Sequence, residues 1–467
     1  MGKKIKRVVE GLEVTDINSK GMGVAKDASK AVYFIKNTIP GDLVDVLVYK
    51  KRRGYFEAEP TAFIKESPHR VTPPCSHFGL CGGCKWQHLD YAQQLQFKEK
   101  GVLQNLYKIG KVTPQKTLPI IAAPDPYWYR NKLEFSFSNN RWLTPQEIQS
   151  DEQHHRQGLG FHKPGRWDKI ISIQQCHLQA DPSNEIRNAL LAYAIAENIS
   201  FYDVKKQEGF LRTLMIRNTQ AGDFMVLVQF FESNSKAEEK ILSFLKNTFP
   251  QISSLLYCIN NKPNDTLYDQ DIKVYAGEDH LVESMEALNF KITAKSFYQT
   301  NPKQAHVLYQ LVREWADLKG SEVVYDLYTG TGTIALFLAS QCKKIVGIEA
   351  IPEAVEDAQF NAKNNQIDNA FFEAGDMKSL FNEDFIKQHG KPDVIITDPP
   401  REGMHPKVVQ QLLQLNASTI VYVSCNSATQ ARDLELLTAH YIVEKSQAVD
   451  LFPQTGHVEN VVLLKRK

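Results

Sequence analysis

The 467-residue sequence has no long apolar run, no low-complexity tract and only 7 cysteines. Without about 18 consecutive apolar residues, a helix that spans a membrane is not expected. The basic start, residues 1–10, lacks the apolar stretch of a secretory signal, so we expect a cytoplasmic protein. In a reducing cytoplasm, cysteines serve metal binding or catalysis more often than disulfides. These absences argue against membrane proteins and disulfide-rich secreted proteins.

Charge is nearly balanced overall but unevenly distributed along the chain. The net charge is +1, yet residues 1–70 carry 14 Lys and Arg against 9 Asp and Glu, and the remainder has a net charge of −4. Such asymmetry is typical of a module that contacts nucleic acid, although a solvated basic tail has the same composition. In the basic segment, Lys50–Arg53 precede Tyr55 and Phe56, which places cations beside rings that can stack on single-stranded RNA.

The length predicts about three domains. Residues 1–66 contain short β-rich runs with turns between them, the pattern of an oligonucleotide-binding (OB-like) β-barrel. The pattern of residues 67–290 predicts a mixed α+β central domain. From residue 291 to 467, apolar runs alternate with helical stretches, which predicts a doubly wound α/β domain with a mostly parallel sheet. Its seven predicted strands are 323–327, 344–348, 370–373, 394–397, 419–423, 441–449 and 458–464.

A cysteine cluster predicts a metal centre. Cys75, Cys81 and Cys84 lie within ten residues, with two glycines that allow a tight turn, and Cys176 is the best candidate for a fourth ligand. Four thiolates suit zinc or an iron–sulfur cluster. Zinc sites usually pair two C-x2-C motifs, so the three-plus-one arrangement favours iron–sulfur over zinc or unrelated buried cysteines.

A glycine motif predicts a nucleotide-like ligand. The segment from Tyr325 to Thr333 follows a strand, opens a helix and contains Gly330 and Gly332. Glu349 follows 19 residues after Gly330, at the end of the next predicted strand, where a carboxylate can bind a ribose diol. The motif fits a dinucleotide enzyme as well as an S-adenosylmethionine enzyme.

Two further strand ends carry reactive side chains. Asp398-Pro-Pro-Arg401 ends the fourth predicted strand, and Ser424-Cys425-Asn426 ends the fifth. Open α/β sheets bind ligands at the carboxyl ends of their strands. Cys425 is therefore a candidate nucleophile, with a buried strand cysteine as the plainer alternative.

Together these motifs resemble the RNA uracil-5-methyltransferases, in particular the bacterial iron–sulfur enzymes that act on 23S ribosomal RNA. The resemblance covers nearly the whole chain and includes a basic N-terminal barrel of the TRAM type. Further matching segments are Ser296–Asn301, Asp398–Arg401, Ser424–Asn426 and His457–Glu459. Thr333 is a departure, because the ribosomal enzymes have Asn there.

The resemblance implies a role for each of these residues. It implies that a [4Fe–4S] cluster is held by Cys75, Cys81, Cys84 and Cys176. It implies that S-adenosylmethionine is contacted by Gln299, Tyr328, Glu349 and Asp398. Cys425 would be the nucleophile and Glu459 the base, with His457 as a second candidate base because its ordinary pKa is more convenient.

The expected function is transfer of a methyl group from S-adenosylmethionine to C5 of a specific uridine in 23S rRNA through a covalent Cys–C6 adduct. A base inside a duplex would have to be flipped out, so a loop uridine is expected. The same chemistry on a tRNA T-loop uridine is one alternative, and an iron–sulfur nicotinamide-dependent oxidoreductase is another. An amino-group methyltransferase and a non-catalytic RNA-binding protein fit less well. No membrane and no obligate protein partner are expected.

Overall fold

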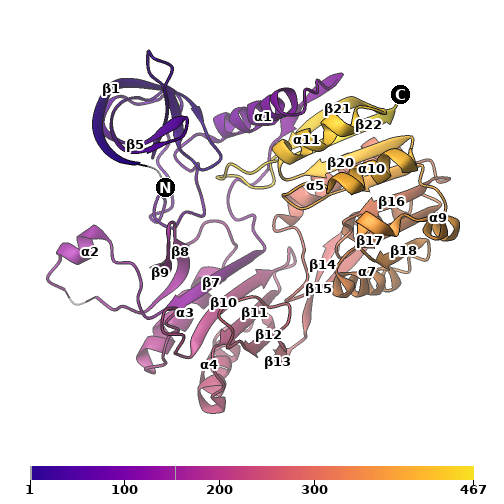
Figure 1. Cartoon of the computed structure of the whole chain (residues 1–467). Helices are drawn as coiled ribbons and strands as arrows, with labels where there is room; N and C mark the ends of the chain where they lie inside the picture. Colours follow the sequence, from indigo (N-terminus) through magenta and orange to yellow (C-terminus); the bar gives the residue numbers. More distant parts are fainter. Residues whose placement is uncertain (1–2, 153) are drawn as a thin grey trace.

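The computed structural model describes residues 3–152 and 154–467 (Figure 1). A small barrel, a central sheet with two helices and a larger C-terminal sheet lie around a common junction. The loop that carries Cys75, Cys81 and Cys84, together with helix α1 (Tyr91–Lys108), connects the barrel to the rest of the chain. Within the described residues, no helix is long and apolar enough to cross a membrane.

The N-terminal strands form a closed barrel in the order β1-β2-β3-β5-β4, which confirms the predicted five-stranded barrel. Inward side chains alternate with outward ones, and the inward set, including Val44, Val46 and Val48, is fully buried. Closure leaves no free sheet edge. The strands are β1 (Lys3–Ile17), β2 (Gly23–Lys26), β3 (Val32–Ile35), β4 (Leu43–Arg52) and β5 (Tyr55–Lys65).

The central part contains a seven-stranded sheet in the order β13-β12-β11-β10-β7-β8-β9. Helices α3 (Ser183–Ala196) and α4 (Ser235–Thr248) pack on one face through a shared apolar core. The opposite face is partly covered by the hairpin of β14 (His280–Met285) and β15 (Leu288–Thr293). The remaining strands are β7 (Lys132–Ser138), β8 (Gly158–Lys163), β9 (Arg166–Ser172), β10 (Leu211–Asn218), β11 (Phe224–Phe230), β12 (Ile252–Ile259) and β13 (Lys273–Gly277). A short helix, α2 (Pro145–Gln149), lies between β7 and β8.

The C-terminal sheet has eight strands in the order β18-β17-β16-β19-β20-β22-β21-β6. All seven strands predicted after residue 291 are present. The prediction of a seven-stranded sheet is nevertheless wrong by one strand, because β6 (Lys116–Ile121) pairs in parallel with β21 at the edge. That addition depends on a partner more than 320 residues away, so no local pattern indicates it. The other seven are β16 (Val323–Leu327), β17 (Lys344–Glu349), β18 (Ala370–Ala374), β19 (Val394–Thr397), β20 (Thr419–Ser424), β21 (Tyr441–Val449) and β22 (Glu459–Arg466).

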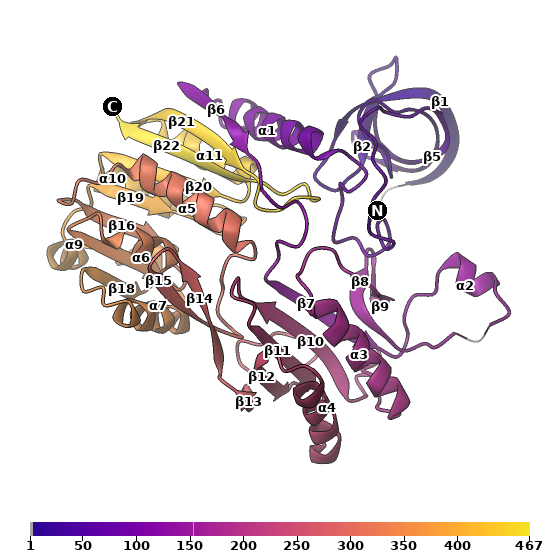
Figure 2. The ribbon, with the colours of Figure 1, turned by 180° about the vertical axis from the view of Figure 1, so that it is seen from behind.

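Helices cover both faces of this sheet (Figure 2). Successive strand residues point to opposite faces of the sheet and pack in two separate apolar cores. Val324 packs with α5, α6 and α7, whereas its neighbour Tyr325 packs with α1, α9, α10 and α11. This arrangement confirms the doubly wound α/β prediction. The helices are α5 (Pro302–Ala316), α6 (Thr333–Ala339), α7 (Pro352–Asn364), α8 (Met377–Leu380), α9 (Glu383–His389), α10 (Pro406–Leu415) and α11 (Ser427–Leu437).

Candidate functional site

The strand order brings the predicted reactive residues to one edge of the C-terminal sheet. β16, β17, β19 and β20 are parallel, so Asp326, Glu349, Asp398 and Cys425 all lie at or just beyond their carboxyl ends. β22 is antiparallel to β20 and pairs Ser424 with Asn460, so its first residue, Glu459, begins level with the end of β20. Residues from four strands and a returning strand thus meet at one place.

Cys425 is half-buried and faces a groove. Together with Arg401 and His457 it lines a cavity of about 580 Å³. The far side of this cavity is formed by α1 and by Ile17, Asn18 and Ser19 of the barrel, placing the thiol between the barrel and the C-terminal sheet. The thiol is therefore partly accessible from a cavity that both the barrel and the C-terminal sheet line.

Three ionisable groups share this edge. Burial, then the nearby Glu459 and Asp398 carboxyls, raise the pKa of Cys425 to about 11, while Arg401 opposes the shift. Burial also raises the pKa of Asp398 to about 7, with a smaller contribution from Asp326, and raises the pKa of Glu459 well above its ordinary value. Like charges held together in a desolvated site cannot all ionise, so the site retains protons near neutral pH.

Hydrogen bonds hold the Cys425 turn against the neighbouring loop. The Asn426 side-chain amide donates to the Arg401 carbonyl at 2.8 Å, and the Thr429 hydroxyl donates to the same carbonyl at 3.1 Å. Below the turn, the Gln430 side-chain amide donates to the Tyr422 and Asn460 carbonyls, both at 3.0 Å. These contacts fix β20 and β22 beside the thiol. Sequence reasoning missed Gln430, because a buried amide on a helix gives no distinctive local pattern.

The predicted nucleotide loop has the backbone that a ligand site requires. Gly330 and Gly332 adopt φ of 56° and 80°, and Tyr328 is held at 64°, a conformation costly for a side-chain-bearing residue. Among the described residues, no atom lies within 4 Å of the position that a Gly330 Cβ would occupy. The Glu349 carboxylate accepts the Gly330, Ala350 and Ile351 N–H groups at 2.7–3.1 Å. Three of about four acceptor positions are then used, which leaves one for a hydroxyl donor.

The loop 296–301 packs beside this glycine turn. The Thr331 hydroxyl donates to the Phe297 carbonyl at 3.4 Å, and the Asn131 side-chain amide from the central part donates to the Gln299 carbonyl at 3.2 Å. Phe297 itself is 69% exposed. The structure therefore brings Gln299, Tyr328, Glu349 and Asp398 to the same end of the sheet, and central-part contacts hold the loop that carries Gln299.

Residues that are distant in sequence hold the segment before Glu459 in place, and no sequence pattern indicated them. Lys98 on α1 forms a fully buried ion pair with Asp450, with 2.6 Å between Nζ and Oδ1. The Gln94 side-chain amide donates to Gln454 Oε1 at 2.9 Å, and the Gln454 carbonyl accepts the Lys85 and Trp86 N–H groups. Because Lys98 and Asp450 are 352 residues apart, only the fold could have shown that they pair.

The four clustered cysteines lie together in a second cavity. Cys75, Cys81, Cys84 and Cys176 all line a space of about 340 Å³, whereas Cys258 and Cys342 are buried core residues. Burial raises the pKa of each of the four thiols, to about 12 for Cys84. Asn184 holds the backbone of Cys176 at both its N–H and its carbonyl, at 2.7 and 3.2 Å.

The four sulfurs are less compact than the ligands of a single metal ion. In a tetrahedral zinc site with Zn–S bonds of about 2.3 Å, neighbouring sulfurs are roughly 3.8 Å apart. Within the described part of the chain, the only group of three candidate ligand atoms within 4.8 Å of one another is Glu278, Asp279 and His280. The four cysteines do not form such a compact group, although they line one cavity.

Comparison with known proteins agrees with this architecture. Residues 269–467 match the family described as tRNA (Uracil-5-)-methyltransferase, and residues 7–61 match the TRAM domain. A protein of Bacteroides thetaiotaomicron is 50% identical over 96% of this chain and 99% of its own length, and one of Porphyromonas gingivalis is 50% identical over 97% and 99%. Both are described as uncharacterized RNA methyltransferases.

A solved structure matches the complete architecture. The Pyrococcus abyssi tRNA (uracil-54, C5)-methyltransferase, in complex with S-adenosyl-L-homocysteine, is 28% identical and has a TM-score of 0.74 over 98% of this chain and 100% of that one. A TRAM barrel joined to a methyltransferase sheet defines the class of RNA-modifying methyltransferases. Within that class, the chain belongs to the RNA uracil-5-methyltransferase family.

Proposed function

We propose that this chain transfers a methyl group from S-adenosylmethionine to C5 of a loop uridine in 23S rRNA through a covalent adduct on Cys425. The observation that carries the proposal is the position of Cys425, half-buried in a groove beside the Asp398 and Glu459 carboxyls. Family membership favours methyl transfer over the nicotinamide-dependent alternative. The aromatic residue that amino-group methyltransferases place after two prolines is replaced by Arg401.

Cys425 and Glu459 fill the two roles that methylation of uracil C5 requires. Uracil C5 is a weak nucleophile, so the Cys425 sulfur first adds its electron pair to C6, and the C5–C6 π electrons move onto the C4 oxygen. Bound S-adenosylmethionine supplies an electrophilic methyl group, which C5 accepts as S-adenosylhomocysteine is released. Glu459 then removes the C5 proton, and the C6–S bond breaks to restore the double bond and the Cys425 thiolate.

The carboxyl pair has a second role, because the proton of the Cys425 thiol needs an acceptor. Because the pKa of Cys425 is raised to about 11, the thiol is protonated near neutral pH and must lose its proton before it attacks. Asp398, with a pKa raised to about 7, is partly ionised in the same range and is the acceptor we assign. We also assign a cofactor contact to Asp398, and a sulfonium beside it would favour the ionised form of both carboxyls.

The cofactor contacts are proposed from the glycine turn and its neighbours. Glu349 retains acceptor capacity for a ribose hydroxyl, the loop that carries Gln299 contacts Thr331 of the glycine turn, and Tyr328 lies two residues before Gly330. The neighbour from P. abyssi, with S-adenosyl-L-homocysteine bound, supports the same cofactor class for this chain.

We further propose that Cys75, Cys81, Cys84 and Cys176 hold a [4Fe–4S] cluster. Their shared cavity and their desolvation support it. The methyl transfer consumes no electron, so the cluster's role is to hold the loops. The Lys85 and Trp86 N–H groups, which directly follow Cys84, donate to Gln454, five residues before Glu459.

The domain division that we propose is 1–66 for the TRAM barrel, 67–290 for the central domain and 291–467 for the methyltransferase domain. Strand β5 ends at Lys65, in agreement with the first boundary. Helix α1 and strand β6 belong to the central stretch by sequence but pack on the C-terminal sheet. The second boundary falls inside strand β15, so the junction is a shared surface rather than a linker.

A tRNA T-loop uridine is the second candidate substrate. It is favoured by the P. abyssi neighbour, which acts on tRNA uracil-54. The deciding experiment maps 5-methyluridine by mass spectrometry in ribosomal and transfer RNA from cells with and without the gene. Loss of one 5-methyluridine from 23S rRNA is expected. Loss from tRNA alone would select the second candidate, and no loss from either RNA would contradict both.

A further inference from the structure

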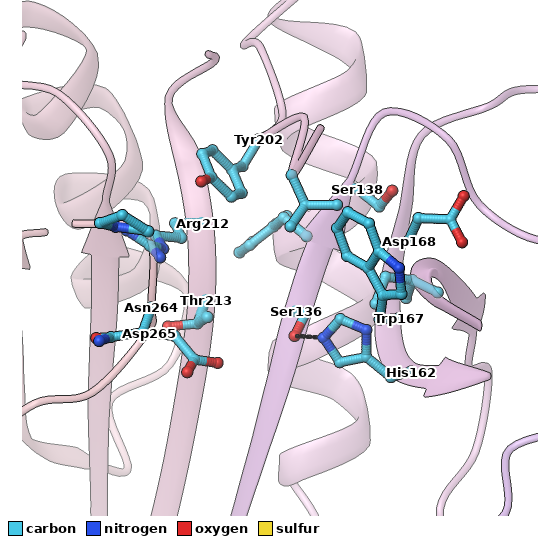
Figure 3. Close-up of a pocket in the computed structure, with 14 residues that line it drawn as sticks. Ser136, Ser138, His162, Trp167, Asp168, Tyr202, Arg212, Thr213, Asn264 and Asp265 are labelled. Atoms are coloured by element: carbon cyan, nitrogen blue, oxygen red, sulfur yellow. Dashed lines mark hydrogen bonds between the residues drawn. The ribbon is translucent and has the colours of Figure 1, made fainter. Parts of the chain in front are cut away.

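A separate cavity of about 220 Å³ lies on the open face of the central sheet (Figure 3). Strand alternation explains why hydroxyl groups line part of its wall. In β7, Phe135 and Phe137 join the core under α3, so Ser136 and Ser138 face the other way. On the adjacent strand, Thr213 pairs directly with Ser136. The strands that bury an apolar core on one side thus present a row of hydroxyls to the cavity on the other.

Two buried hydroxyls at this cavity have no hydrogen-bond partner among the described residues. Tyr202 is 6% exposed and Thr213 is 8% exposed, and both side chains line the cavity. Their hydroxyls are buried and unpaired. An unsatisfied buried hydroxyl destabilises a fold, so its presence at a cavity wall calls for an explanation. A ligand with a polar edge would satisfy both groups.

The indole ring of Trp167 lies across the cavity from Tyr202. Figure 3 shows Trp167 and His162 on one side and Tyr202 and Arg212 on the other. Trp167 is 63% exposed, so its indole ring is free to stack on a ligand at the cavity. Unpaired RNA bases are commonly bound by stacking on such rings while their edges are hydrogen-bonded.

Cations surround the same opening. Lys205 and Arg166 approach Asp168 to 2.8 and 3.4 Å, and more than half of each cationic side chain is exposed. The cavity wall carries Asp168, Asp265 and Arg212, so the excess of positive charge depends on Lys205 and Arg166 beside it. Burial lowers the pKa of Lys169, and the nearby Lys205, Arg156 and Arg166 lower it further, which shows that these cations are crowded together. Clustered cations next to a stacking ring suit a phosphate backbone.

We propose that this cavity binds one unpaired base of the RNA substrate, a nucleotide other than the one that is methylated. Trp167 stacks on the base, and the hydroxyls of Tyr202 and Thr213 pair with its polar edge. The cavity is smaller than the roughly 300–1,000 Å³ of ordinary small-molecule sites, so one planar ring fits better than a whole cofactor. The inference rests on RNA as the substrate in the proposed function, and it assigns part of the enzyme's RNA selectivity to the central sheet.

Substitutions can separate this role from a structural one. Tyr202→Phe and Thr213→Val each remove an unpaired hydroxyl while keeping the shape of the side chain, so stability should be unchanged or higher. RNA affinity should nevertheless fall, about tenfold for the double variant and about tenfold for Trp167→Ala. Ser254→Ala is the matched control, because Ser254 is another buried, unpaired hydroxyl of the same sheet that does not line the cavity.

The full-length variants are tested with 23S rRNA and with total tRNA, both purified from cells lacking the gene. Thermal melting, filter-binding Kd at fixed salt and the rate of 5-methyluridine formation are measured. The proposal predicts weaker binding and a higher KM with kcat retained, and a Ser254→Ala variant like the wild type. Binding within twofold of the wild type for every cavity variant would overturn it.

These measurements distinguish failure of the base-binding site from failure of the proposed methyl transfer. If the wild type forms 5-methyluridine and the cavity variants bind RNA normally, only the base-binding site is wrong. If the wild type binds RNA without forming 5-methyluridine, and the cavity variants bind less tightly, the site stands and the proposed reaction is wrong.

Discussion

The molecule contains two cysteine sites that are alike in burial but differ in their charged neighbours. Burial raises the thiol pKa in both, to about 11 for Cys425 and about 12 for Cys84. Around Cys425 the nearby charges are two carboxyls and one guanidinium, whereas around Cys84 they are the other cysteines. A lone thiol beside proton acceptors suits nucleophilic attack, and a group of thiols without acceptors suits a shared electrophilic metal centre.

The cavities at the two sites also differ in size and in the parts of the chain that form them. Cys425 faces the larger groove between α1, the barrel and the C-terminal sheet, which can admit RNA. The four clustered cysteines line a smaller cavity with Arg130, Phe161 and Leu178. Burial alone therefore does not assign the role of a cysteine in this protein. The neighbours within reach of each sulfur distinguish the two roles, and substitutions of those neighbours test the distinction.

The largest expected effect is the loss of the nucleophile. Cys425→Ala should lower methylation by at least about a thousand-fold, because no other group at this edge can add to C6. RNA containing 5-fluorouridine should form a covalent complex with the wild type, since C5 cannot lose its fluorine as a proton. Denaturing electrophoresis and peptide mass mapping detect the adduct on Cys425. Cys342→Ala, at a buried core cysteine, is the control and should retain trapping and turnover.

The identity of the base is tested by a stalled adduct. Glu459→Gln should still allow addition and methyl transfer, but removal of the C5 proton should fail, leaving a covalent complex with ordinary RNA. Desolvation in the groove and the nearby cations lower the pKa of His457, so its imidazole is neutral and could accept a proton. Because Glu459 is the base that we assign, His457→Gln should keep most of its turnover. Intact-mass measurement after quenching compares the two. An adduct that accumulates with the His457 variant alone would reverse the assignment.

The predictable part of the fold is local. The strands ending at Thr397 and Ser424 could be inferred because each is a short apolar run followed by a polar motif. The geometry of parallel strands then brings those ends together without further information. Asp398 and Cys425 could therefore be assigned to one edge from sequence patterns and resemblance.

The unpredicted part depends on pairs that are distant in sequence. Strand β6 joins a sheet whose other strands begin some two hundred residues later, and the Lys98–Asp450 ion pair connects a helix to a loop near the C-terminus. Alternation along β10 likewise does not reveal that Thr213 lacks a partner. These features arise from tertiary packing, which local periodicity does not encode.

The metal content tests the second cysteine site. Protein purified without oxygen should be brown, with about four iron atoms per chain, and Cys81→Ser should lose them because one of the thiolates is removed. Metal analysis and the visible absorption spectrum measure this directly. Cys258→Ser, at a core cysteine outside the cavity, should keep its iron. Stoichiometric zinc without iron would contradict the cluster.

A smaller effect should appear in the reactivity of Cys425. Iodoacetamide reacts with the thiolate, so the alkylation rate should rise with pH toward a midpoint near the thiol pKa of about 11. Glu459→Gln removes a carboxylate that raises this pKa, so the midpoint should move to lower pH, with roughly tenfold faster alkylation at pH 9. Arg401→Gln removes an opposing charge and should move it upward. Equal midpoints for both variants would show that the carboxyls are too distant to act on the thiol.

The smallest effect concerns the barrel, which contacts RNA through charge rather than chemistry. Lys51 and Arg53 are exposed, whereas Arg52 donates to Glu57 at 2.8 Å and is already neutralised. Removing Lys51 and Arg53 should weaken RNA binding a few-fold, and each lost phosphate contact should reduce the slope of log Kd against log salt by somewhat under one. Arg52→Ala should change the slope less, and Lys387→Ala, on the distant helix α9, should leave it unchanged. If all three variants show the wild-type slope, the basic charge of the barrel does not face the RNA.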